Sequence, residues 1–227
     1  MVEVFASTDA GRRHPDLVQA CAAAGVPWTL VGASEIAGLC QTVTPQGVVA
    51  VVRMLEVDVA ELVARRPELV AVLVQVRDPG NAGTVMRTAD AAGAGGVVLT
   101  GASVDPYNGK CVRATAGSLF HLPVVLGASP EQAAVALRAA GLRVLAADAR
   151  GDRDIDELTQ DATLAGPTAW LFGNEAWGLP GDVVALADEV VRIPIYGQAE
   201  SLNLASAAAV ALYASARAQR APSPVRP

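Results

Sequence analysis

Beyond its first third, the sequence alternates short apolar runs of strand length with segments of helical character, and this alternation is what most constrains the fold. Val70–Val76 and Thr168–Phe172 have the composition of buried strands, and Val97–Thr100, Leu122–Leu126 and Leu142–Ala147 are further strand candidates. Glycines, or a serine followed by a proline, mark helix ends between them. Strands that alternate with helices form a mostly parallel sheet that helices cover on both faces. The sequence therefore predicts an α/β fold.

The chain before this alternation predicts a separate, smaller unit. Strands are expected at Val2–Ala6, Pro27–Val31 and Gly47–Val52, with a helix over Asp16–Ala24. A polar stretch with an Arg-Arg-Pro break follows, and the last residues of the chain are rich in proline. The predicted organisation, in chain order, is a small α/β domain over 1–53, a linker over 54–69, the larger α/β domain over 70–220 and a flexible tail over 221–227.

Composition excludes several classes of protein. Of the 227 residues, 52% are hydrophobic and 18% are charged, whereas intrinsic disorder requires low hydrophobicity and high charge. No apolar run approaches the roughly 18–20 residues of a membrane-spanning helix, and the N-terminus lacks the basic and apolar regions of a secretory signal. Cys21, Cys40 and Cys111 are far apart and form no CxxC pair, which argues against a disulfide framework and a zinc site. We therefore expect a cytoplasmic protein with no metal and no membrane partner.

Three polar loops follow predicted strands, at the edge of an open α/β sheet where ligands bind. The first runs from Arg77 to Asp90 and holds Asn81 and Arg87. Asn81 is expected in the loop and Arg87 about one turn into the following helix, so that both side chains face the strand ends. The free N–H groups of that helix also favour an anion. The simpler alternative is that Asn81 caps the helix and Arg87 pairs with a surface carboxylate.

The second and third loops have the same placement. In the second, Leu171–Pro180, two glycines bracket an Asn-Glu pair that contains Glu175, and glycine allows a ligand to approach the backbone closely. In the third, Ile193–Ser206, Ser201 and Asn203 open a long Ala-rich helix. An ordinary turn with a solvated glutamate, and a plain serine N-cap, are the alternatives for these two loops when each is considered alone.

Together, these three loops resemble the three motifs of the SpoU-type RNA ribose 2′-O-methyltransferases, a branch of the SPOUT superfamily. The intervening stretch Val104–Phe120 matches as well, and the resemblance covers residues 70–219. The order of the three motifs, their spacing and the strands that flank them all agree with the family pattern. Three independent chance similarities are therefore a poor explanation. The resemblance implies a deep trefoil knot in the C-terminal part of the sheet, S-adenosyl-L-methionine as cofactor, and a homodimer with the active site at the dimer interface.

The resemblance also implies which residues act. Cofactor contacts are implied for Gly173, Ile193, Leu202 and Ser201, and a catalytic set is implied for Asn81, Arg87, Glu175, Ser201 and Asn203. Family mechanisms often name the first-motif arginine, here Arg87, as the base. Because arginine stays protonated in proteins, we expect Arg87 instead to bind the RNA phosphate and stabilise the developing alkoxide. The implied reaction is methyl transfer to a ribose 2′-hydroxyl of structured RNA, with 23S ribosomal RNA favoured over tRNA.

The N-terminal unit resembles the small ribosomal-protein-like RNA-binding domain that precedes many catalytic domains of this kind. Thr42–Ala50 matches the run that closes it. Such domains usually begin with an additional helix and strand, whereas this sequence begins directly at a strand. The expectations are a domain trimmed at its start or a start codon assigned too far downstream, and we favour the second.

The charge balance and three rival functions bear on this interpretation. The net charge of −6 does not exclude RNA binding, because a dimer can gather basic side chains in one cleft. The candidates are Arg77, Arg87, Lys110 and Arg113. A shallow dependence of RNA affinity on salt is predicted. A Rossmann dehydrogenase is disfavoured because the glycines of 93–96 precede a strand instead of following one, and a hydrolase has only two histidines to use. A catalytically idle RNA-binding protein of the same fold stays open as the alternative.

Overall fold

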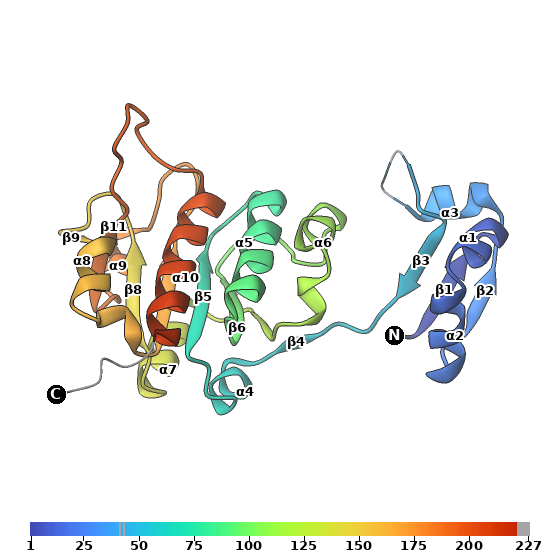
Figure 1. Ribbon diagram of the computed structural model, residues 1–227, viewed down its shortest axis with the longest axis horizontal. Helices are drawn as coiled ribbons and strands as arrows, with labels where there is room; N and C mark the ends of the chain where they lie inside the picture. The colour runs from blue at the N-terminus through green and yellow to red at the C-terminus, as the bar shows by residue number, and fades with distance from the viewer. Residues whose placement is uncertain (41, 43, 222–227) are drawn as a thin grey trace. The chain divides into compact units, whose positions relative to one another are not determined.

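The structure is a computed structural model in which the chain forms two compact units, Met1–Met54 and Leu55–Pro227 (Figure 1). It describes every residue of the chain except 41, 43 and 222–227. The flexible tail predicted over 221–227 therefore lies, apart from its first residue, outside the described residues. No helix among the described residues has the length and apolar character needed to cross a bilayer.

The first unit is a small three-stranded sheet with helices. The sheet has the order β2-β1-β3, in which β2 is parallel and β3 antiparallel to β1. Its elements are β1 Glu3–Ala6, α1 Thr8–Arg13, α2 Pro15–Ala23, β2 Trp28–Leu30, α3 Ala33–Leu39 and β3 Val48–Val51. The sequence analysis does not predict α1, which the Ser7 hydroxyl caps by accepting the N–H of Ala10 at 3.2 Å. Within the Thr42–Ala50 run, Val43 lies outside the described residues.

The second unit is built on an eight-stranded sheet with the order β4-β7-β6-β5-β10-β8-β11-β9. Every strand pairing found among the described residues of this sheet is parallel. The strands are β4 Glu56–Val57, β5 Leu69–Val74, β6 Gly96–Thr100, β7 Val124–Leu126, β8 Arg143–Ala147, β9 Arg153–Asp154, β10 Thr168–Phe172 and β11 Glu189–Arg192. The prediction of an α/β fold with a mostly parallel sheet is confirmed. Because β10 lies between β5 and β8, their carboxyl ends are neighbours.

Helices cover both faces of this sheet. They are α4 Val59–Ala64, α5 Pro79–Ala92, α6 Gly109–Thr115, α7 Pro130–Ala139, α8 Ile155–Gln160, α9 Gly181–Val184 and α10 Leu204–Arg220, with short 3-10 turns at η1 Ser118–Phe120 and η2 Thr163–Ala165. Strand β5 shows how the layers form, since its side chains alternate between the two faces. Leu69 and Leu73 pack in the core under α5 and α10, whereas Val70 and Val74 pack in the core under α4 and α7 (Figure 1).

The prediction that residues 54–69 form a linker is wrong, because this stretch belongs to the second unit. Strand β4 pairs with β7 in the large sheet, and α4 follows it with Leu62 fully buried. Asp58 caps α4, because its Oδ1 accepts the N–H of Glu61 at 2.7 Å. The stretch is polar on average, but it contains one short apolar segment around Leu62, which is buried in the fold.

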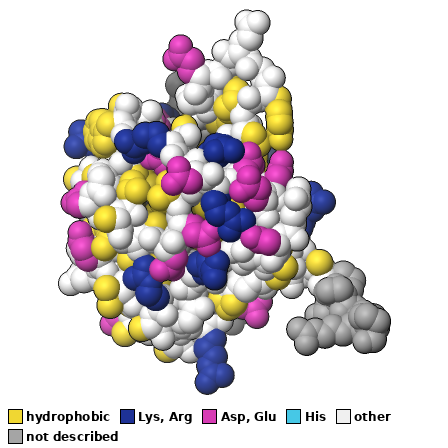
Figure 2. Space-filling model, turned by 90° about the vertical axis from the view of Figure 1, so that its left-hand side faces the viewer, with side chains coloured by type: hydrophobic (Ala, Val, Ile, Leu, Met, Phe, Trp, Pro, Cys, Tyr) yellow, Lys and Arg dark blue, Asp and Glu magenta, His cyan; other side chains and the backbone are white. Residues whose placement is uncertain are grey.

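Ion pairs cover the outer edge of the sheet at β11 and β9. Arg153 contacts Glu189 at 3.0 Å and Asp161 at 2.5 Å, and Arg192 lies 3.6 Å from Asp154. Basic and acidic side chains are correspondingly interspersed on this side of the molecule (Figure 2). An unprotected strand edge is a template for pairing with another chain, and the charges make such pairing unfavourable.

Candidate functional site

The three polar loops meet at the carboxyl ends of β5, β10 and β11. The side-chain amide nitrogen of Asn81 donates to Glu175 Oε1 at 3.0 Å, and that of Asn203 donates to Asn81 Oδ1 at 3.1 Å. One residue from each loop thus belongs to a single hydrogen-bonded chain, with Asn81 in the middle. The partners are 94 and 122 residues apart in the sequence.

Asn81 is held by the first turn of α5. The helix begins at Pro79, and Asp78 caps it with Oδ1 accepting the N–H of Asn81 at 2.7 Å. This hydrogen bond, helped by Lys110 Nζ at 3.0 Å from Oδ2, lowers the pKa of Asp78 below its usual value. Asn81 therefore lies in the helix and not in the preceding loop as predicted. The alternative that Asn81 itself caps the helix is also wrong, because Asp78 does so.

Asn203 is held by the start of α10. Its Oδ1 accepts the N–H groups of Ala205 and Ser206 at 2.9 and 3.4 Å, so Asn203 is the N-cap. With its oxygen used in this way, the amide nitrogen is left to reach Asn81. The helix begins at Leu204, so neither the expected start at Ser201 nor a Ser201 N-cap is correct. Ser201 is exposed, and its hydroxyl makes no hydrogen bond to the described part of the chain.

Asn174 is a buried residue that the sequence analysis did not single out. Its amide nitrogen donates to the carbonyl of Gln75 at 2.7 Å, and its Oδ1 accepts the N–H of Ala176 at 2.8 Å. Asn174 therefore ties the loop after β10 to the end of β5, where Gln75 has a φ of +53°. A polar residue that follows a buried strand by one glycine is the signal that could have identified it.

Gly173 occurs where the chain leaves no room for a side chain. A Cβ at this position would lie 2.3 Å from the carbonyl carbon of Gly178. The backbone of Asn174 and Gly178 is paired across this narrow turn, at 2.9 and 3.0 Å. Glycine is therefore required for the loop to close on itself, which supports the expectation that backbone lines this part of the site.

A pocket of about 660 Å³ opens beside the hydrogen-bonded chain. Its lining includes all of the predicted cofactor contacts, which are Gly173, Ile193, Ser201 and Leu202. It also includes four of the five predicted catalytic residues, which are Asn81, Glu175, Asn203 and again Ser201. Asp148 and Arg150, which follow β8, also line it and were not predicted, although the strand-end rule applies to them. The Arg150 guanidinium donates to both carboxylate oxygens of Asp148 at 2.9 and 2.8 Å, which lowers the pKa of Asp148.

Arg87 is the one predicted catalytic residue that does not line this pocket. It is exposed on α5 and makes no hydrogen bond or ion pair with any described residue. The reason is helical geometry. Six residues turn an α-helix by about 600°, which places Arg87 roughly 120° around α5 from Asn81. Within one chain, the two side chains do not face the strand ends together as expected.

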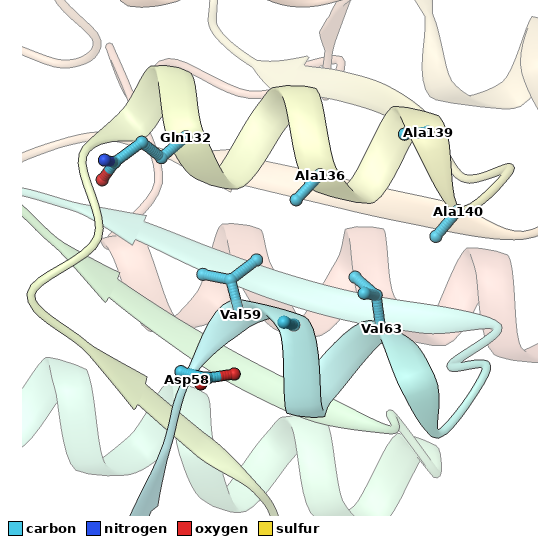
Figure 3. A pocket seen from close by; sticks show the side chains of 8 residues that line it. Asp58, Val59, Val63, Gln132, Ala136, Ala139 and Ala140 are labelled. Atoms are coloured by element: carbon cyan, nitrogen blue, oxygen red, sulfur yellow. The ribbon is translucent and has the colours of Figure 1, made fainter.

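The described residues offer no rival site of comparable chemistry. A groove of about 650 Å³ between α4 and α7 is lined mostly by alanine and valine (Figure 3). Its polar residues Asp58 and Gln132 are used as helix caps. Burial raises the pKa of Cys111 to about 11, which leaves it a thiol and no nucleophile. Among the described residues, no cluster of His, Cys, Asp and Glu is placed to hold a metal ion.

Comparison with known families accounts for the arrangement of these loops. A family model described as the SpoU rRNA Methylase family matches residues 68–213, which is more than half of the chain. The chain belongs to this family. A second model, described as RNA 2′-O ribose methyltransferase substrate binding, matches residues 1–57. The resemblance seen in the three loops is therefore confirmed, and it extends to the N-terminal unit.

Named relatives of this SpoU family member include two bacterial proteins. It is 36% identical over 189 residues to 23S rRNA (guanosine(2553)-2′-O)-methyltransferase RlmP of Bacillus subtilis, covering 83% of this chain and 72% of the relative. It is 39% identical to 23S rRNA (uridine(2479)-2′-O)-methyltransferase of Streptomyces viridochromogenes, covering 76% of this chain and 61% of the relative. A crystal structure of the SpoU methyltransferase AviRb from that organism, in complex with AdoMet, matches with a TM-score of 0.81 and 31% identity, covering 95% of this chain and 81% of the other.

Proposed function

We propose that this protein transfers a methyl group from S-adenosyl-L-methionine to a ribose 2′-hydroxyl of RNA, with 23S ribosomal RNA as the favoured substrate. The observation that carries the proposal is the meeting of Asn81, Glu175 and Asn203 at the mouth of one pocket. Both relatives described above are named as 23S rRNA 2′-O-methyltransferases. A catalytically idle RNA-binding protein would have no need for a pocket beside these side chains.

The pocket suits the proposed cofactor. An adenosyl group needs apolar walls and backbone polar groups, and the pocket offers the side chains of Ile193 and Leu202 together with the glycine-walled turn at Gly173. Its volume of about 660 Å³ lies in the range of small-molecule sites. Gly173, Ile193, Ser201 and Leu202 would hold the cofactor in this proposal. When bound, the cofactor would supply a methyl group activated by a positively charged sulfur.

The side chains of the hydrogen-bonded chain would orient the RNA. Glu175 is exposed at the pocket and accepts from Asn81 on one oxygen, which leaves its second oxygen able to accept a ribose hydroxyl proton in a hydrogen bond. Asn81 would hold that carboxylate directly, and Asn203, the N-cap of α10, would hold Asn81. Fixing the hydroxyl in this way contributes to the rate by positioning. Arg87 would bind the adjoining phosphate and stabilise negative charge on the attacking oxygen.

This role for Arg87 leads to a proposal about assembly. Because Arg87 is exposed and lies outside the pocket of its own chain, we propose that the active unit is a homodimer in which Arg87 of one copy completes the site of the other. Light scattering coupled to size exclusion should give twice the 23.1 kDa mass of the chain. A monomeric mass with full activity would contradict the proposal.

The path of the chain after β11 supports a knot as the family resemblance implies. Strand β11 lies beyond β8 in the sheet, yet α10 packs against α5, β5 and β10. The connecting segment 193–203 therefore runs back across the sheet and reaches Asn81 beside the loop after β10. We propose that it passes through the loop there and forms the trefoil knot.

The N-terminal unit would bind RNA, and a cytoplasmic location would follow from a ribosomal RNA substrate.

The deciding experiment is transfer of labelled methyl from S-adenosyl-L-methionine to unmodified total RNA, followed by digestion to nucleosides. Label in a 2′-O-methylnucleoside is the expected result, and fractionation beforehand would assign it to 23S rRNA or to tRNA. Asn203→Ala is the variant to compare, because it removes the contact to Asn81 and should lose most of the activity. Cofactor and RNA binding without any transfer would favour the idle RNA-binding alternative. Absence of cofactor binding would overturn the proposal.

A further inference from the structure

An exposed tryptophan and an arginine lie stacked beside the proposed site. Trp177, in the loop after β10, is 51% exposed. The guanidinium carbon of Arg77, in the loop after β5, lies 5.1 Å from the centroid of the indole ring. Among the described residues, Arg77 has no hydrogen-bond or ion-pair partner. The two side chains therefore form a cation–π pair that is partly open to solvent.

The exposure of Trp177 contrasts with the burial of the aromatic side chains in the preceding strand β10. Trp170 in β10 is 1% exposed, and its indole N–H donates to Ser215 Oγ at 2.9 Å. A tryptophan left half in water exposes apolar surface that a fold ordinarily buries. The turn that carries Trp177 is closed by backbone pairing of Asn174 and Gly178, so its closure does not depend on the indole. About half of the Trp177 side chain is exposed and open to contact with a ligand.

The position of the pair relates it to the proposed reaction. Arg77 directly precedes Asp78, the cap that holds Asn81, and Trp177 lies two residues after Glu175. Trp177 also lines the pocket, and its half-exposed side chain places it toward the opening. An RNA whose ribose reaches Asn81 and Glu175 would therefore bring a nucleobase to the level of these two side chains. Unstacked RNA bases are recognised by stacking on aromatic rings and on arginine planes.

We propose that Arg77 and Trp177 form a platform on which a nucleobase of the RNA substrate stacks, next to the ribose that is methylated. The inference rests on the proposed function and adds a positioning role for two residues outside the predicted catalytic set. The indole supplies a flat apolar face, and the guanidinium supplies a positive charge close to the phosphate backbone. In a chain of net charge −6, a guanidinium that lies over a pocket-lining indole and has no carboxylate partner among the described residues would favour the approach of RNA there.

The depth of the pocket separates this role from a cofactor contact. The inner walls are buried, with Phe172 at 1% and Val191 at 0% exposure, whereas Trp177 stands at the rim. The cofactor is expected in the inner part, beside Gly173. The half-exposed indole of Trp177 is therefore available to the RNA substrate, which would bind nearer to the opening of the pocket than the cofactor. The experiment must therefore measure both affinities.

The test uses the full-length chain with Trp177→Ala, Trp177→Phe and Arg77→Ala. Methyl transfer is measured against the concentration of in-vitro-transcribed, unmodified 23S rRNA, and cofactor affinity is measured by calorimetry. For Trp177→Ala we expect the KM for RNA to rise by roughly 5- to 150-fold, the range that one base–aromatic stack supports, with the Kd for S-adenosyl-L-methionine unchanged. Trp177→Phe should restore most of the affinity because a phenyl ring also stacks. Arg77→Ala should raise the KM by less.

Phe120→Ala is the matched control. Phe120 is 52% exposed, close to the 51% of Trp177, and it does not line the pocket. Its variant should keep the wild-type KM. A similar rise in KM for Phe120→Ala would overturn the proposal, since the effect would then belong to any exposed aromatic residue.

A spectroscopic readout separates stacking from a purely structural role. Addition of short single-stranded RNA should quench tryptophan fluorescence in the wild type, and Trp177→Phe should lose that quenching while it still binds the RNA. A wild-type KM in Trp177→Ala, or a raised cofactor Kd with RNA affinity unchanged, would overturn the platform and leave the proposed function intact. A wild type that neither binds nor methylates RNA would instead overturn the proposed function, and the platform with it.

Discussion

Asn81 shows how much a single residue organises here. Its backbone N–H donates to Asp78, its side-chain nitrogen donates to Glu175 and its side-chain oxygen accepts from Asn203. The short carboxamide supplies both the donor and the acceptor that the two side-chain contacts need, whereas an ionised aspartate lacks the donor and leucine lacks both. These two contacts therefore favour asparagine at this position.

Arg87→Lys tests the role proposed for the arginine. The change keeps the positive charge and removes the planar fork that binds phosphate in two places. We expect kcat to fall by about 10²–10³-fold, the scale for loss of one transition-state donor, with cofactor affinity preserved. The comparison is single-turnover methyl transfer alongside calorimetry. Near-normal turnover would rule out the assignment.

Gly173→Ala tests the tight turn of the second loop. The added methyl group would meet the backbone of Gly178, which cannot move without opening the turn. We expect a loss of about 1–3 kcal/mol in the free energy of unfolding, as for an overpacked site, and weaker cofactor binding. Denaturant unfolding and calorimetry would measure the two effects. Gly181→Ala is the control, because a Cβ there meets nothing within 4 Å, and equal behaviour of the two variants would contradict the argument.

At the scale of elements, local signals predicted some boundaries well and missed others. Helix α7 begins after Ser129, and the serine followed by a proline marks its start as the sequence analysis expects. A serine N-cap, a proline and a capping glutamine all occur there. Helix α8 was missed although Asp154 and Glu157 form a capping box, a signal that was present in the sequence. Strand β4 has only two residues and no local pattern, and it exists because β7 offers it a partner.

Asp78 links the start of α5 to pH. The pKa of Asp78 is lowered in the folded protein, so its contribution to stability is complete above the unfolded value of about 3.9 and is lost as the pH falls through the folded value. We expect Asp78→Ala to lose about 1 kcal/mol of unfolding free energy at neutral pH, the usual cost of a lost N-cap. Thermal unfolding across acid pH measures this. Asp78→Asn keeps the cap but loses the carboxylate charge. Its loss of unfolding free energy relative to the wild type should shrink as the pH falls. A loss that stays constant with pH would contradict the link between the Asp78 pKa and stability.

At the scale of the whole molecule, charge governs the encounter with RNA. The chain is acidic overall, and Lys110, one of four candidate basic contacts, already pairs with Asp78 at 3.0 Å. Each neutralised phosphate contributes about −0.7 to the slope of log K against log salt for single strands. We therefore expect a slope no steeper than about −3 per site in a salt titration of RNA binding. A much steeper slope would show that a basic surface outside this set binds the RNA.

The sequence by itself determined the parallel α/β class, because periodicity and glycines are local signals. It also showed three polar loops at strand ends, and their resemblance to the SpoU motifs implied seven of the residues that line the pocket. Only the tertiary structure decided that β10 lies between β5 and β8, and hence that Asn81, Glu175 and Asn203 meet. It also decided that Arg87 faces away from its own pocket and that Asn174 joins two loops. Strand order depends on packing between segments about a hundred residues apart, and no local pattern in the chain records that packing.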